Sequence, residues 1–186
     1  DVTEGSGAGD IGYASGVATG DIDGDGDVDL FISNLDADVL LRNDGGGHFT
    51  DITDQSDVGD DGWGTSTTFF DADAESDLDM YVCRYAQWSS EDVLPCLGIG
   101  VNDLETPDYC KPSRYPPSTD LFYLNNGHGQ FTDATKSSGI AAVEGYGLGV
   151  VAADFNGDGA TDVFVANDTV PDRFWQNNGD GTFVES

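Results

Sequence analysis

The stretch that decides the fold is Asp21-Ile22-Asp23-Gly24-Asp25-Gly26-Asp27-Val28-Asp29, which precedes the apolar run Leu30-Phe31-Ile32. Two like charges about 4 Å apart repel by roughly 4 kcal/mol at an effective dielectric constant of about 20, so these crowded carboxylates need a cation. Calcium fits best, because it takes about six to eight oxygen ligands in a flexible shell. The expected ligands are the side chains of Asp21, Asp23, Asp25 and Asp29 and a backbone carbonyl near Asp27.

An EF-hand is the obvious alternative, because its loop also begins with the pattern D-x-D-x-D-G. That loop requires a bidentate glutamate at its twelfth position and a helix on each side. The twelfth residue here is Ile32, and residues 28–33 are β-branched, aromatic and apolar, as in a buried strand. The ligand set therefore ends at the ninth position, inside a strand-loop-strand unit.

The acidic loop occurs three times, which favours metal binding over the alternative of an acidic surface turn. The further candidate ligands are Asp71, Asp73, Glu75 and Asp79 in the second copy and Asp154, Asn156, Asp158 and Asp162 in the third. The twelfth residue is aliphatic in every copy. In the second copy Ala74 and Ser76 replace the two glycines, so we expect this loop to bind calcium most weakly.

The loops belong to a longer repeat that predicts four short strands per unit of about 50 residues. A glycine-rich turn of the Asn-Gly type, a strong hairpin signal, separates the third and fourth strands. The expected strands are 16–19, 66–70 and 149–153, then 29–32, 79–82 and 162–165, then 39–43, 121–125 and 173–177, and last those that begin at Phe49, Phe131 and Phe183. We therefore expect an all-β fold of three propeller-blade-like four-stranded repeats, with the calcium loops between first and second strands.

The chain, residues 1–186, is expected to form one β-repeat domain with units at about 1–50, 51–132 and 133–186. The middle unit contains an excursion at 84–119, with a helical turn expected near residues 90–94. Within it Cys96 and Cys110 enclose about 15 residues, and a disulfide there would be worth roughly 3 kcal/mol in the chain-entropy model, so we predict this pair. Cys83 is expected to be a small core residue.

Charge and composition limit the partners and the location. A net charge of −30 excludes nucleic acid as a default partner and argues against binding to anionic membranes. No apolar run approaches the length of a membrane span, so no membrane insertion is expected. The sequence opens at Asp1 in mid-pattern, as in a processed or excised piece. Because millimolar calcium is an extracellular condition, we expect a secreted or cell-surface protein.

Catalysis is not expected, because no side chains form a nucleophile and base pair. His48 and His128, the histidines of the chain, occupy equivalent hairpin turns. A calcium-dependent hydrolase is the enzymatic alternative. Trp88, Tyr109 and Tyr115 in the excursion could bind a sugar or a partner protein, or form a small core of the excursion itself.

Three motifs carry a family resemblance. The D-x-[DN]-x-D-G loops, the D-[LV]-F-[IV] strands and the N-N-G-[DH]-G-x-F turns resemble the FG-GAP/VCBS repeats of integrin α-subunit propellers. Residues 109–112, followed by 120–127, look more narrowly like bacterial ASPIC/UnbV proteins related to cartilage acidic protein. The resemblance covers essentially the whole chain. It implies calcium in the first and third loops, an extracellular setting, an adhesive or structural role and no catalysis.

Three units are too few for a ring, since propellers close with about four to eight blades. Residues 183–186 run into the register of residues 1–3, with a two-residue overlap, so two copies could share a blade end to end. We therefore predict a secreted calcium-binding structural or adhesive protein that self-associates, as in an extracellular filament. The alternative is a propeller fragment that binds a cell-surface protein or glycan.

Overall fold

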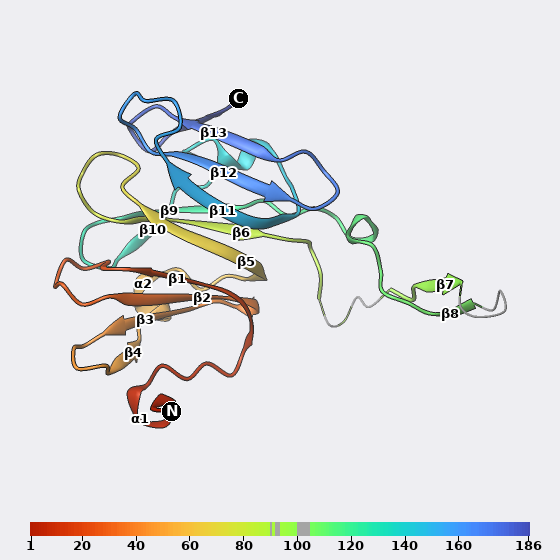
Figure 1. The fold of residues 1–186 in the computed structure, drawn as a ribbon, viewed down its shortest axis with the longest axis horizontal. Helices are drawn as coiled ribbons and strands as arrows, with labels where there is room; N and C mark the ends of the chain where they lie inside the picture. The colour runs from red at the N-terminus through yellow and green to blue at the C-terminus, as the bar shows by residue number, and fades with distance from the viewer. Residues whose placement is uncertain (90, 92–93, 100–104) are drawn as a thin grey trace.

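The computed structural model describes residues 1–89, 91, 94–99 and 105–186, and the helical turn predicted near residues 90–94 rests on positions outside this set. The regular secondary structure of the described chain is almost entirely antiparallel β. Three four-stranded units stack side by side like the blades of a propeller, with the two termini at opposite ends of the stack (Figure 1). The predicted all-β, blade-like class is confirmed.

Each unit is a meander of four antiparallel strands, with an acidic loop between its first and second strand. The strands are β1 (Tyr13–Gly20), β2 (Asp29–Ala37), β3 (Val39–Asn43) and β4 (Phe49–Asp51), then β5 (Asp61–Phe70), β6 (Asp79–Arg84), β9 (Leu121–Asn125) and β10 (Phe131–Asp133), and finally β11 (Gly147–Ala153), β12 (Asp162–Asn167), β13 (Arg173–Asn177) and β14 (Phe183–Glu185). The third strands have the predicted bounds and the fourth strands begin at the predicted phenylalanines. The first and second strands are longer than predicted.

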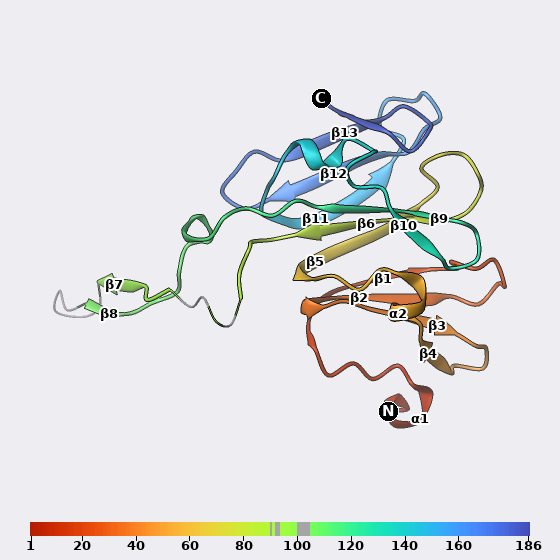
Figure 2. The same ribbon diagram turned by 180° about the vertical axis from the view of Figure 1, so that it is seen from behind.

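Part of this extra length joins the first two units. The end of β2 pairs with the start of β5, with Leu35 opposite Trp63, so the first two units form one continuous curled sheet. The third unit is a separate four-stranded sheet. Its first strand, β11, lies beside β5, as β5 lies beside β1, so the first strands of the three units are neighbours in space (Figure 2).

The hydrophobic core consists of two layers, each between two units. The layer between the first and second units contains Ile22, Phe31, Leu40, Ile52, Val58, Met80, Val82, Tyr123 and Phe131. The layer between the second and third contains Phe70, Ala72, Tyr81, Cys83, Phe122, Ala134, Ile140, Val163, Val165, Trp175 and Phe183. Cys83 is buried with a free thiol, as predicted for a core residue. Each unit therefore shares a buried core with at least one neighbouring unit.

A short helical segment precedes each unit. α1 (Thr3–Ser6) precedes the first unit, α2 (Thr53–Ser56) the second and η3 (Ile140–Ala142) the third. Among the described residues, no helix is both long and apolar enough to cross a membrane.

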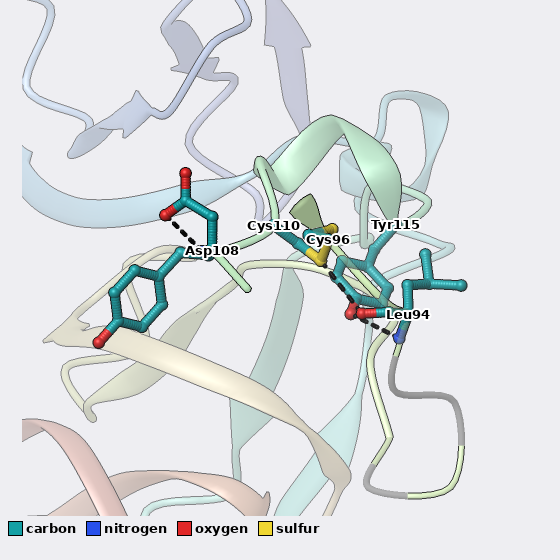
Figure 3. The surroundings of a disulfide bond; sticks show 6 residues. Leu94, Cys96, Asp108, Cys110 and Tyr115 are labelled. Atoms are coloured by element: carbon teal, nitrogen blue, oxygen red, sulfur yellow. Dashed lines mark hydrogen bonds between the residues drawn. A yellow bond between two sulfur atoms is a disulfide. The ribbon is translucent and has the colours of Figure 1, made fainter. Parts of the chain in front are cut away.

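The excursion projects from the second unit, between β6 and β9 (Figure 1). It contains the hairpin of β7 (Leu97–Ile99) and β8 (Glu105–Pro107), followed by η2 (Pro112–Arg114). The predicted disulfide is present: Cys96 and Cys110 are bonded, with their Cα atoms 5.3 Å apart. Figure 3 shows Tyr115 beside this bond, where its hydroxyl accepts a hydrogen bond from the backbone N–H of Leu94 at 3.3 Å.

The excursion's aromatic side chains do not form a separate core. Trp88 packs edge-on against Trp63 of β5, with ring centroids 6.0 Å apart, and Tyr109 is fully exposed. Tyr146 and Trp175 are buried, as expected at repeat positions, but Trp63 is only half-buried. The reason is its position at the rim, where it lies between the blade and the root of the excursion.

Candidate metal centre

Each acidic loop is wrapped around its first aspartate by backbone hydrogen bonds. Asp21 accepts from the N–H groups of Gly24 at 2.9 Å and Gly26 at 3.0 Å, one on each carboxylate oxygen. The second loop repeats this with Asp71 and the N–H groups of Ala74 and Ser76, and the third with Asp154, Gly157 and Gly159. The three loops therefore share one backbone conformation, whether or not the glycines are present.

This conformation brings carboxylates together in two of the loops. Asp21, Asp23 and Asp25 each offer one oxygen, and these oxygens all lie within 4.8 Å of one another. The same holds for Asp71, Asp73 and Asp79 in the second loop. Hard carboxylate oxygens at this spacing suit calcium, so the residues present fit the ion that the sequence predicts.

The third loop is arranged differently at its centre. Asn156 accepts the N–H of Asp158 through Oδ1 at 2.8 Å and donates from Nδ2 to the Asp158 carboxylate at 2.7 Å. An amide nitrogen cannot ligate calcium, so Asn156 could offer only its Oδ1, which already accepts the N–H of Asp158.

The ninth aspartate of each loop supports the backbone as well as the site. Asp29, Asp79 and Asp162 are fully buried. Asp29 accepts the N–H of Ile22 at 2.9 Å through one oxygen and the N–H of Asn43 at 2.7 Å through the other, which ties the loop to β3. Asp79 and Asp162 make the matching pairs of bonds. Of these three, Asp79 also lies within its loop's carboxylate cluster.

Burial makes the carboxylates of Asp29 and Asp79 hard to ionise without a cation. Loss of solvation raises the pKa of Asp79 to about 7, against the effect of its two backbone hydrogen bonds. Burial also raises the pKa of Asp29, and the charges of Asp23 and Asp25 raise it further. A bound divalent cation would offset both effects by favouring the ionised forms.

In the second loop, the burial of two side chains does not follow the predicted set of ligands. The side chain of Glu75, predicted as a ligand, is exposed. Asp77, which was not predicted, has a buried carboxylate oxygen, Oδ1, without a hydrogen-bond partner. Burial and the charges of Asp73 and Asp71 raise its pKa. The sequence signal for Asp77 was its position, because it is the seventh residue of its loop, as Asp27 is of the first loop. The side chain of Asp27 is nevertheless exposed.

Replacement of Ala74 and Ser76 by glycine is expected to stabilise the second loop. Both residues adopt the left-handed backbone region, with φ of 65° and 70°, where the first loop has Gly24 and Gly26. Relief of this strain should raise the free energy of unfolding by about 1 kcal/mol per site after the glycine entropy cost. Thermal unfolding of Ala74→Gly and Ser76→Gly measures the gain. The reciprocal change, Gly157→Ala in the third loop, should destabilise, and a neutral result there would contradict the strain argument.

The comparisons with known proteins agree with this geometry. The FG-GAP-like repeat family matches residues 21–82, 113–165 and 154–186, which together make up more than half of the chain. Cartilage acidic protein 1 of Xenopus tropicalis is 35% identical over 86 residues, which is 46% of this chain. The Homo sapiens protein of the same name is 31% identical over 94 residues, or 50% of this chain.

The match covers 13% of the length of each of these two relatives, so the similarity concerns the repeats and not the whole of either relative. The repeated acidic loops, the four-stranded units and the family match coincide along the chain. The chain belongs to the FG-GAP-like repeat family.

Proposed function

We propose that this chain is an extracellular calcium-binding structural repeat module with an adhesive or scaffolding role and no catalysis. The observation that carries the proposal is the convergence of carboxylate oxygens in the first and second acidic loops, within 4.8 Å of one another. The family match, the likeness to cartilage acidic protein 1 and the Cys96–Cys110 disulfide support an oxidising extracellular setting.

Calcium would act on the fold through the contacts that the loops make with neighbouring units. The carbonyl of Ile22, the second residue of the first loop, accepts a hydrogen bond from the side chain of Asn125 in the second unit at 2.8 Å. A metal that holds the loop in shape therefore also holds the surface on which the next unit packs. Calcium binding and blade stacking should be coupled for this reason.

Calcium titration by calorimetry tests the proposal one loop at a time. Wild-type protein should bind calcium at the loops, and Asp21→Asn should remove one binding event because Asp21 organises the first loop. Glu75→Gln is the matched control, since the side chain of Glu75 is exposed, and should leave the number of sites unchanged. Absence of binding by wild-type protein would overturn the proposal, and equal losses in the two variants would contradict this assignment of ligands.

A cavity at the root of the excursion favours a second candidate function, glycan binding. Its volume is about 350 Å³, and its lining includes Trp63, Tyr85, Trp88 and Tyr115. Aromatic faces of this kind can stack on sugar rings. Trp88→Ala should abolish binding on a glycan array without lowering the Tm. Ile99→Ala, at an exposed site outside the cavity, should leave glycan binding unchanged.

A further inference from the structure

Four aromatic side chains line the cavity at the root of the excursion, which we call the aromatic cavity. Trp63 comes from β5, and Tyr85, Trp88 and Tyr115 come from the excursion. All four side chains are partly exposed, so a ligand can reach their rings from solvent. The first unit contributes Leu35, which pairs with Trp63 across the joint between the first two units. The cavity is therefore formed inside the stack, away from its outer faces.

The rings that line the aromatic cavity meet at steep angles. The plane of Trp63 makes an angle of 71° with that of Tyr85 and 65° with that of Trp88, and the ring centroids are 5.0 and 6.0 Å apart. Such walls face in different directions, whereas stacking of a sugar ring needs one flat face. Walls of this kind favour a compact, rounded group that touches several rings at once.

Hydrogen bonds and the disulfide hold these walls in place. The hydroxyl of Tyr85 donates to the carboxylate of Asp168 in the third unit at 2.7 Å. The hydroxyl of Tyr115 accepts the N–H of Leu94 at 3.3 Å, close to the Cys96–Cys110 bond (Figure 3). A cavity whose walls are fixed before binding loses little conformational freedom when a ligand enters.

The charge of the aromatic cavity is negative. The carboxylate of Asp108 belongs to its lining. Asp108 accepts the N–H of Tyr109 at 2.8 Å, and none of the ion pairs among the described residues includes it. Lys111 and Arg114 are exposed and lie outside the lining. Since the whole chain has a net charge of −30, its field also draws cations toward the surface. A positively charged ligand therefore fits the cavity best.

The chemistry of the walls selects among cations. Calcium needs about six to eight oxygen ligands, which walls of aromatic carbon cannot supply. A primary ammonium group has N–H donors, and their burial without hydrogen-bond acceptors is costly. A methylated ammonium group has methyl groups in place of these donors and keeps its charge. The faces of Trp and Tyr rings attract such groups electrostatically, and aromatic cages are their usual recognition sites.

We infer that the aromatic cavity binds a methylated ammonium group, such as that of choline or of a trimethylated lysine side chain. The group would contact the ring faces, with its charge close to the Asp108 carboxylate. A second cavity, of about 630 Å³, shares part of this lining and gives room for the rest of the ligand. The shared residues are Ala86, Trp88, Leu94 and Tyr115.

This inference is independent of the calcium sites. The acidic loop at residues 71–79 precedes β6 and the excursion follows it, so the loop and the aromatic cavity lie at opposite ends of the strands (Figure 1). The inference concerns the same cavity as the glycan candidate but assigns it a ligand of another class. A neutral sugar has no use for the charge of Asp108, whereas a cation depends on it. Calcium binding, glycan binding and cation binding can therefore fail separately.

Calorimetric titration of the whole chain with choline chloride, in millimolar calcium, tests the inference. The matched probe is 3,3-dimethylbutan-1-ol, which has the shape of choline with carbon in place of the charged nitrogen. Choline should bind at least about tenfold more tightly than this neutral alcohol. Trimethyl-lysine, titrated in the same way, distinguishes the two sources of the group, because the natural source should give the tighter binding.

Variants identify the residues responsible. Asp108→Asn should weaken choline binding about threefold and leave binding of the neutral alcohol unchanged. Glu105→Gln is the matched control, since it removes the same charge from an exposed site of the excursion outside the lining, and should change neither. Trp88→Ala should weaken choline binding about tenfold, and Trp88→Phe, which keeps an aromatic face, should retain part of the affinity.

Three results would overturn the inference. The first is no binding of either choline or trimethyl-lysine by wild-type protein. The second is equal affinity for choline and the neutral alcohol, which would show that the charge is not recognised. The third is an equal effect of Asp108→Asn and Glu105→Gln on choline binding. Binding of a neutral sugar in place of choline would support the glycan candidate and overturn the inference, and calcium binding would be unaffected in every case.

Discussion

Removal of calcium with a chelator is expected to lower the Tm by about 20 °C or more. At about 1 mM calcium and a Kd of about 10 µM, one site that binds only the folded state adds about 2.7 kcal/mol. Three loops would add about 8 kcal/mol, comparable with the total stability of a typical domain, about 5–15 kcal/mol. For a domain of this size about 1 kcal/mol moves the Tm by about 2–4 °C.

Differential scanning calorimetry with chelator and with excess calcium measures this shift. Magnesium is the control, because its strict octahedral geometry and reluctant dehydration suit these loops poorly, and it should restore little of the Tm. A Tm that does not respond to chelation would show that the carboxylates are tolerated without metal and that the backbone bonds alone hold the loops.

Asp29→Ala is expected to destabilise the protein by about 3 kcal/mol or more even in chelator. The reason is structural: Asp29 is fully buried and accepts the N–H groups of Ile22 and Asn43, and alanine would leave both donors without a partner. Urea denaturation with and without calcium measures the loss. Asp162→Ala should behave similarly, because Asp162 makes the equivalent bonds to Phe155 and Asn177.

Asp25→Ala separates the structural effect from the loss of a ligand. Asp25 is exposed and belongs to the first carboxylate cluster, so its replacement should cost stability in calcium and little in chelator. If Asp29→Ala lost stability in calcium alone, Asp29 would act as a ligand and its backbone bonds would be of minor importance.

The sequence alone was sufficient for the third strands, the starts of the fourth strands and the loops, because these depend on local chemistry. The third strands end at Asn43, Asn125 and Asn177 as predicted, since a glycine-rich turn follows each of them. Alternating aspartates specify the loop conformation, because the second loop adopts it even though Ala74 and Ser76 stand at positive φ in place of glycines. The Cys96–Cys110 pair followed from spacing within a segment that has little core of its own.

The role of each loop residue depends on its burial, and burial cannot be predicted from the local sequence. Asp29 and Asp25 are both aspartates of one motif, yet one is fully buried with two backbone donors and the other faces solvent. Burial also separates Glu75 from Asp77. Glu75 was predicted as a ligand and is exposed, whereas Asp77 was not predicted and has a buried carboxylate oxygen. Burial is set by the neighbouring hairpin and strand, and these come from distant parts of the chain.

Sequence by itself determined the class, the repeat and the acidic loops of this protein, because periodicity and turn chemistry act over a few residues. Tertiary structure alone decided how the units meet. The hydrogen bond from the Asn125 side chain to the Ile22 carbonyl joins residues about a hundred positions apart, and nothing local distinguishes the buried Ile22 from the exposed Phe155 at the same loop position. The difference is whether another unit covers that face, and that is a property of the stack.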